Sequence, residues 1–189
     1  MEIILASKSP RRKEILENLK IDFKVLSADA DESTDIAEPK ALVKELALRK
    51  AEAVKNLLIK NRQYSDDTII IGCDTVVYSN GKILGKPKDR KDAFQMLKEL
   101  SGKCHTVTSG IALVKKDKTL IDSETTTVFF DDITDGEIEE YVATGESDDK
   151  AGAYGIQGLA SKFIKGIEGC YFNVVGLPVN LLHKMLKKF

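Results

Sequence analysis

The segment that most constrains this chain is its beginning, where an apolar run leads directly into a turn with two arginines. Ile3–Ala6 is apolar and predicts a buried strand. Ser9 is a suitable N-cap and Pro10 a preferred first helical residue, so a helix is expected to begin there. Backbone N–H groups, a serine hydroxyl and the guanidinium groups of Arg11 and Arg12 would then meet at the positive end of the helix. This pattern favours a site for a phosphate-sized anion.

Composition limits the kind of protein. A chain of 189 residues suits one domain, or one domain with two lobes. The net charge of −1 gives no general attraction to nucleic acid or acidic membranes, so any anion site must be a local cluster. Since no apolar run approaches the roughly 18 residues of a membrane-spanning helix and no signal peptide is recognisable, we expect a cytoplasmic protein without a membrane segment. The cysteines of the chain are isolated in the sequence, so they indicate neither a zinc site nor a disulfide framework. They are Cys73, Cys104 and Cys170.

Helix and strand signals alternate along the chain. Beyond the first strand and helix, strands are expected over 23–26, 68–77, 82–84, 105–114 and 120–130. Further helices are expected over 39–59, 89–100, 138–143 and from residue 178. The stretch 145–176 holds seven of the thirteen glycines and is expected to form loop and short strands. This mixture predicts an α/β fold with a mixed sheet.

Two cations lie on apolar helix faces. Lys50 is seven residues after Val43 and four before Val54, and Arg12 is four before Leu16. An unpaired buried cation is unfavourable, so each is expected either to reach solvent along its apolar stem or to face an anion. One inward lysine fits either alternative, whereas two inward cations favour an anion site.

Two carboxylates complement these cations. Asp74 ends the apolar run 69–73, and the carboxyl ends of buried strands are where α/β folds place ligand-binding groups. The alternative, a turn or capping aspartate, is disfavoured because the β-branched residues 75–77 extend the strand. Glu32 lies in an acidic loop, 27–39, where carboxylates are usually only solvated. A hard cation such as Mg²⁺ needs only one or two carboxylates plus phosphate oxygens, so Glu32 with Asp74 would suffice.

Two loops carry further polar candidates. Lys86 lies between Gly85, which permits close backbone approach, and Pro87, which favours an extended conformation before it. An ordinary surface lysine is the alternative there. The glycine-rich stretch 151–158 contains Gln157, whose amide offers a donor and an acceptor to a nucleobase edge. The alternative is a plain glycine-rich connection, and the stretch lacks the Gly-Lys-Ser/Thr of a Walker loop.

Taken together, these segments resemble the Maf family of nucleoside triphosphate pyrophosphatases over residues 1–189. The matching motifs are Ser7-Lys8-Ser9-Pro10-Arg11-Arg12, Arg49-Lys50-Ala51, Gly72-Cys73-Asp74-Thr75-Val76-Val77, Gly85-Lys86-Pro87-Lys88-Asp89, the run 149–158 and Val175-Gly176-Leu177-Pro178. The resemblance implies a single Maf-like domain with a two-lobed α/β fold, similar to ITPase folds, around a curved mixed sheet with a central cleft. It also implies hydrolysis of a nucleoside triphosphate to the monophosphate and pyrophosphate with a divalent metal, Mg²⁺ or Mn²⁺.

The resemblance also assigns roles to individual residues. Asp74 matches the catalytic proton acceptor, and Glu32 matches a metal-associated glutamate, with Asp31 as the alternative in the same loop. Asp74 is a second expected metal ligand. The positions that match phosphate-binding residues are Ser9, Arg11, Arg12, Lys50 and Lys86. The positions that match residues linked to substrate choice are Arg12, Thr75 and Gln157.

The expected reaction is attack of water on the α-phosphorus, assisted by the metal. Asp74-Thr75 and the run 153–157 look like the branch of the family that acts on dTTP and UTP, and not the branch that acts on methylated GTP. Modified pyrimidine triphosphates would satisfy the same contacts. The family resemblance further implies a homodimer, removal of non-standard nucleotides and a part in cell-division arrest.

Rival hypotheses remain open at this point. A non-catalytic nucleotide-binding regulator of cell division needs the cations more than the carboxylates, so the presence of both Glu32 and Asp74 favours the enzyme. A purely structural α/β domain would have to explain why Arg12 and Lys50 lie on apolar faces. Nucleic-acid binding finds little support in the net charge.

Overall fold

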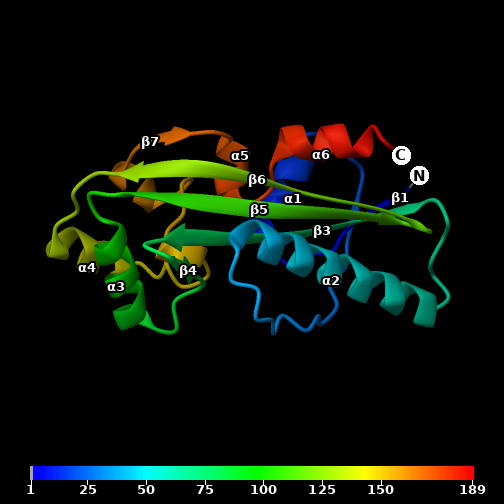
Figure 1. The fold of residues 1–189 in the computed structure, drawn as a ribbon, viewed down its shortest axis with the longest axis horizontal. Coiled ribbons are helices and arrows are strands. Elements are labelled where there is room, and N and C mark those ends of the chain that lie inside the picture. The colour runs from blue at the N-terminus through cyan, green and yellow to red at the C-terminus, as the bar shows by residue number, and fades with distance from the viewer. Residues whose placement is uncertain (1) are drawn as a thin grey trace. The chain divides into compact units, whose positions relative to one another are not determined.

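Long β-branched and apolar runs form the strands of one mixed sheet. In the computed structural model, which describes residues 2–189, the strands are β1 (Glu2–Leu5), β2 (Lys24–Val25), β3 (Thr68–Ser79), β4 (Lys82–Leu84), β5 (Cys104–Lys115), β6 (Lys118–Phe130) and β7 (Ile164–Glu168). Their order is β2-β1-β3-β5-β6-β7, with β4 paired to β3 (Figure 1). β1 runs parallel to β2 and β3, whereas the β3–β4 and β6–β7 pairs are antiparallel. The predicted α/β class with a mixed sheet is confirmed.

The helices follow their local start signals. They are α1 (Pro10–Asn18), α2 (Pro39–Lys60), α3 (Arg90–Leu100), α4 (Asp135–Ala143), α5 (Tyr171–Val175) and α6 (Val179–Leu186), with short 3₁₀ segments η1 (Ala151–Ala153) and η2 (Leu159–Phe163). Ser9 is the N-cap of α1, and Thr134 and Glu137 form a capping box at α4. None of the helices within residues 2–189 is both long and apolar enough to cross a membrane.

The stretch 145–176 differs from its prediction. The sequence predicts loop and short strands there, but the stretch holds η1, η2 and α5 beside the single strand β7. The 3₁₀ turns rest on local hydrogen bonds, such as Ala153 N–H to Lys150 O at 3.0 Å. Turns this short bury too few side chains to leave a periodic apolar pattern, so glycine content alone suggested a loop.

The chain divides into two compact units. The first contains the described residues up to Asp74, together with Ser109–Glu124 and Gly176–Phe189. The second contains Thr75–Thr108 and Thr125–Val175. The division falls within β3, β5 and β6, so each of these strands contributes residues to both units.

In the first unit, α2 packs its apolar face on the sheet (Figure 1). The buried cluster joins helix residues to strand residues and includes Ala47, Ala51, Val54, Leu58, Ile4, Ile70, Ala112 and Val114. A Cβ atom added at Gly72 would overlap the carbonyl oxygen of Ala47, so helix and strand can approach closely only because residue 72 is glycine. This approach brings the middle of α2 close to the part of β3 that precedes Asp74.

The second unit has its own core, and this core contains a buried histidine. His105 is 3% exposed, its Nε2 lies 2.7 Å from the Tyr154 hydroxyl, and its ring meets Phe130 edge-on at 5.0 Å. Its Nδ1 has no hydrogen-bond partner among the residues that the structure describes. Burial lowers the pKa of His105 to about 4.

This histidine predicts that the protein loses stability in mild acid. In the unfolded chain, the pKa of His105 returns to about 6.5, so the unfolded state binds more protons between about pH 6.5 and 4. The free energy of unfolding should therefore be fully retained above about pH 6.5 and should fall by up to about 1.4 kcal/mol per pH unit below it. Urea denaturation at a series of pH values between 7 and 5 measures this slope. The slope should persist in the control His183→Gln, and a flat profile would contradict the prediction.

Candidate active site

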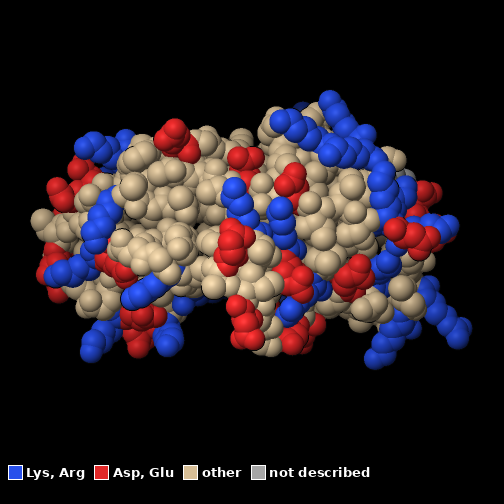
Figure 2. All heavy atoms as spheres, viewed as in Figure 1, with Lys and Arg blue, Asp and Glu red and all other residues tan. Residues whose placement is uncertain are grey.

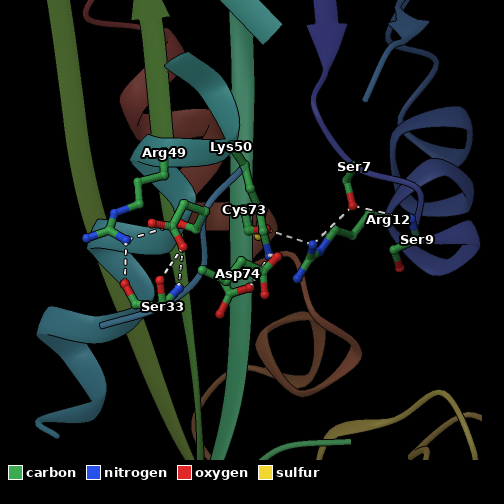
Figure 3. Close-up of polar contacts among 10 residues, drawn as sticks. Ser7, Ser9, Arg12, Ser33, Arg49, Lys50, Cys73 and Asp74 are labelled. Atoms are coloured by element: carbon green, nitrogen blue, oxygen red, sulfur yellow. Dashed lines mark hydrogen bonds and ion pairs between the residues drawn. The ribbon is translucent and has the colours of Figure 1, made fainter. Parts of the chain in front are cut away.

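Two carboxylates and a lysine meet at the end of the first unit's part of β3. The Lys50 ammonium lies 2.5 Å from Asp74 Oδ1 and 3.0 Å from Glu32 Oε1 (Figure 3). The side chains of Lys50 and Asp74 are only 19% and 13% exposed, whereas Glu32 is exposed at 59%. Lys50 therefore faces two carboxylates of the chain, and its role in binding phosphate stays a prediction. The inward lysine and the aspartate at the strand end therefore lie together in one cluster of charged side chains.

Arg12 joins three segments of the first unit beside this cluster. Its Nη1 donates to Cys73 O at 2.8 Å and to Ser7 Oγ at 3.1 Å (Figure 3). Its Nε donates to Gly176 O at 2.9 Å. The guanidinium thus contacts the residue that immediately precedes Asp74. Burial raises the pKa of the Cys73 thiol, whose Sγ contacts Gly176 O, so the thiolate form is disfavoured at this position.

The start of α1 has the expected turn. The Ser9 N–H donates to Ser7 Oγ at 3.2 Å, and Pro10 occupies the first turn of the helix. The Ser9 hydroxyl makes no capping hydrogen bond, so it is available to a ligand at the helix start. Arg11, which precedes Arg12 on α1, is half-buried. The Ser7 hydroxyl therefore accepts hydrogen bonds from both the Ser9 backbone and the Arg12 guanidinium. Sequence reasoning does not assign Ser7 to the site.

Arg49 orders the acidic loop that carries Glu32. Its Nη1 donates to Asp31 O at 3.0 Å and to Ser33 O at 2.8 Å, while its Nε donates to Glu45 Oε1 at 2.7 Å. The Ser33 N–H also donates to Asp31 Oδ1 at 2.9 Å (Figure 3). Sequence reasoning missed this role. The sequence does contain a signal for this role. An arginine stands next to Lys50 on a predicted helix, and the acidic loop has no predicted secondary structure of its own.

We expect Arg49→Ala to loosen this loop. The change removes both hydrogen bonds to the carbonyls that flank Glu32, each worth on the order of 1 kcal/mol. Amide hydrogen exchange over residues 31–35 should therefore accelerate by up to about thirtyfold, as followed by mass spectrometry. The control Arg90→Ala, on α3, should leave this exchange unchanged. If exchange in the loop were equally slow in Arg49→Ala, its order would have to come from another contact.

The remaining predicted residues belong to the second unit. Thr75 follows Asp74 on β3 and is half-buried, Lys86 is exposed after β4, and Gln157 is exposed between η1 and η2. The residue before Lys86 accepts a hydrogen bond through its carbonyl from the Gly152 N–H at 3.0 Å. That these three residues share one site with Asp74 stays a prediction.

The charges of the site form a local cluster. On the face drawn in Figure 2, acidic and basic side chains of the described residues are interspersed. Among residues 2–189, no group of three or more His, Cys, Asp or Glu side chains is arranged to hold a metal ion. Glu32 and Asp74 nevertheless share one positive charge, that of Lys50. Two carboxylates completed by phosphate oxygens are the ligands by which Mg²⁺ is usually bound, so this donor set fits Mg²⁺ or Mn²⁺ together with a polyphosphate.

Fold and site together define an α/β protein with a cluster of carboxylates and cations at the end of a central strand. The family model described as Maf-like protein matches residues 2–189. The chain therefore belongs to the Maf family, and this part of the resemblance is confirmed.

Curated relatives match over nearly their whole length. A protein of Clostridium acetobutylicum named dTTP/UTP pyrophosphatase is 50% identical, over 98% of this chain and 96% of its own. Proteins with the same name from Pelotomaculum thermopropionicum and Alkaliphilus oremlandii are 48% and 49% identical, over 100% and 98% of this chain and 96% and 95% of their own. Among solved structures, the Staphylococcus aureus Ham1 protein aligns with a TM-score of 0.49 and 15% identity over 69% of this chain and 72% of that one.

Proposed function

We propose that this chain is a nucleoside triphosphate pyrophosphatase that hydrolyses dTTP and UTP to the monophosphate and pyrophosphate. The observation that carries the proposal is the Asp74 carboxylate at the strand end, 2.5 Å from Lys50, which also contacts Glu32. Membership of the Maf family and the name shared by relatives at 48–50% identity support it. Modified pyrimidine triphosphates belong to the same proposed substrate class.

In the proposed mechanism, Asp74 is the general base. It accepts a proton from a water molecule as the water oxygen attacks the α-phosphorus. The bond between the α-phosphorus and the oxygen that bridges to the β-phosphorus then breaks. Pyrophosphate leaves with that bridging oxygen, and the monophosphate carries the oxygen from water. Lys50 keeps Asp74 in place on the strand, because its ammonium contacts the carboxylate directly.

Cations of the chain would stabilise the triphosphate. Lys50 has three N–H donors, of which two meet the carboxylates, so the third can reach a phosphate oxygen. The further groups proposed to bind phosphate are Ser9, Arg11, Arg12 and Lys86. A Mg²⁺ or Mn²⁺ ion held by Glu32 and Asp74 would supply additional neutralisation of phosphate charge. Preorganised charges of this kind are often the largest contribution to catalysis.

Thr75 and Gln157, with Arg12, are proposed to set substrate choice. The Gln157 amide can both donate to and accept from the edge of a pyrimidine. We expect Gln157→Ala to lower the ratio of kcat/KM for dTTP over CTP and purine triphosphates by about tenfold, because a hydrogen bond to the base is lost. Steady-state kinetics on each substrate measure this ratio. An unchanged substrate profile would remove Gln157 from this role.

The proposal is tested by pyrophosphate release from a panel of triphosphates. The panel contains dTTP, UTP, CTP, ATP, modified pyrimidine triphosphates and methylated GTP, each with Mg²⁺, with Mn²⁺ and with a chelator. Metal-dependent turnover that favours dTTP and UTP is the expected result. Nucleotide binding without turnover would instead support the non-catalytic regulator of cell division.

The remaining expectations from the family resemblance stay part of this proposal. They are a single Maf-like domain formed by both units, a homodimer, a cytoplasmic location, and a role in removing non-standard nucleotides or arresting cell division. Size-exclusion chromatography with light scattering tests the dimer directly, because a monomeric mass would contradict it.

A further inference from the structure

Two side chains of the second unit hold one end of the segment that carries Gln157. The Tyr141 hydroxyl donates to Glu146 Oε1 at 3.1 Å. The other carboxylate oxygen, Glu146 Oε2, accepts from the Leu159 N–H at 2.9 Å. Hydrogen bonds therefore run from Tyr141 through Glu146 to the Leu159 end of the segment 155–159.

The tyrosine in this arrangement is buried in the core of the second unit. Tyr141 lies on α4, is 2% exposed and packs edge-on against Phe163 at a ring separation of 5.7 Å. Burial and the neighbouring Glu146 raise the pKa of Tyr141, so its hydroxyl stays protonated and can donate to that carboxylate. The residue before the segment, Tyr154, is likewise buried and contacts His105. The segment is thus attached to the core of its unit at several points.

Gly158 shows how closely the segment packs against Glu146. A Cβ atom added at Gly158 would overlap the Glu146 carboxylate. Its backbone, with φ of −104°, is one that other residues can adopt, so the requirement for glycine comes from the carboxylate and not from the backbone. That carboxylate cannot simply move aside, because the Tyr141 hydroxyl and the Leu159 N–H both bind it.

Gln157 lies at the exposed part of this held turn. The Gly158 N–H donates to Gly155 O at 3.2 Å, which closes the turn around residues 156 and 157. The Leu159 N–H is bound by Glu146 while the Gln157 side chain remains exposed. We propose that Tyr141 and Glu146 are positioning residues that hold Gln157 for recognition of the substrate base. This inference rests on the proposed function, because it concerns base preference among triphosphates.

The test compares Tyr141→Phe and Glu146→Gln with two controls on exposed residues, Tyr171→Phe and Glu140→Gln. In both test variants, we expect the preference in kcat/KM for dTTP over CTP to fall about tenfold through a raised KM for dTTP, as one lost hydrogen bond implies. The kcat/KM for CTP should stay within about twofold of the wild-type value. A change that only damaged the fold would lower activity on both substrates together. The controls should keep the wild-type preference.

A second arm uses the packing of Gly158. Gly158→Ala should reduce the dTTP preference in the wild-type background, because the new methyl group displaces the carboxylate. In the Glu146→Ala background the same change should have little further effect, since the obstacle is gone. Additive effects of the two changes would overturn the role of Glu146.

A third arm does not depend on activity. Exchange of the Leu159 amide should be faster in Glu146→Gln than in Glu140→Gln, because its acceptor is weakened. Unchanged exchange, or variants that keep the wild-type dTTP preference, would overturn this inference alone. Wild-type protein that hydrolyses neither dTTP nor UTP would overturn the proposed function and this role with it.

Discussion

Asp74→Asn is expected to lower kcat for dTTP by about 10²–10⁴-fold, the range that a positioned general base contributes. Asparagine keeps the size of the side chain and can still accept a hydrogen bond from Lys50, which lies 2.5 Å from Asp74. An amide oxygen is too weak a base to take a proton from water. The chemical step should therefore fail while the surroundings of residue 74 persist.

Binding and catalysis should separate in this variant. Calorimetric titration with a non-hydrolysable dTTP analogue, in the presence of a chelator so that the metal ligand lost at residue 74 has no effect, should give an affinity close to that of the wild type, because the cations proposed to bind phosphate remain. The control Asp117→Asn, in the exposed turn between β5 and β6, should retain full turnover. Near-wild-type kcat in Asp74→Asn would eliminate Asp74 as the base.

Lys50→Met is expected to lower kcat for dTTP by about 10²–10³-fold, since one well-placed charge on the phosphates is lost. It should also affect stability, because Glu32 and Asp74 would share no cation. Leaving the partly buried Asp74 unpaired should cost about 1–3 kcal/mol, which corresponds to roughly 2–4 °C in Tm for each kcal/mol.

The loss of stability in Lys50→Met should be smaller when a divalent metal is present. Mg²⁺ or Mn²⁺ bound by the two carboxylates would replace the missing positive charge. Differential scanning fluorimetry with and without metal measures the difference in Tm. The control Lys60→Met, at the exposed end of the same helix, should change neither kcat nor the response of Tm to metal. A Lys50→Met protein with wild-type kcat would contradict the assigned role of Lys50.

Local signals account for the parts of the fold that the sequence predicted. The capping box at Thr134 and Glu137, the proline that opens α2 and the apolar run of β3 each act through neighbours within a few residues. The inward position of Lys50 also follows from helical periodicity, although the pattern does not identify Asp74 as its partner. The 3₁₀ turns and α5 could not be predicted, because they are too short to show a period.

Contacts to backbone atoms account for much of what the sequence did not predict. Arg12 donates to the carbonyls of Cys73 and Gly176, and Arg49 donates to two loop carbonyls. Every residue carries a carbonyl, so no residue type marks these acceptors, and Gly176 is separated from Arg12 by 164 positions. The fit of Glu146 against Gly158 is similar, because a glycine does not reveal which side chain occupies the space beside it.

The central claim, that water attacks the α-phosphorus of a pyrimidine triphosphate, is tested most directly by hydrolysis of dTTP in ¹⁸O-labelled water. Mass spectrometry of the products shows which phosphorus atom received the water oxygen. The account predicts one ¹⁸O atom in dTMP, unlabelled pyrophosphate, and formation of both products at least about 10²-fold more slowly in Asp74→Asn. Label in pyrophosphate or inorganic phosphate, or no hydrolysis of dTTP by the wild-type protein, would contradict it.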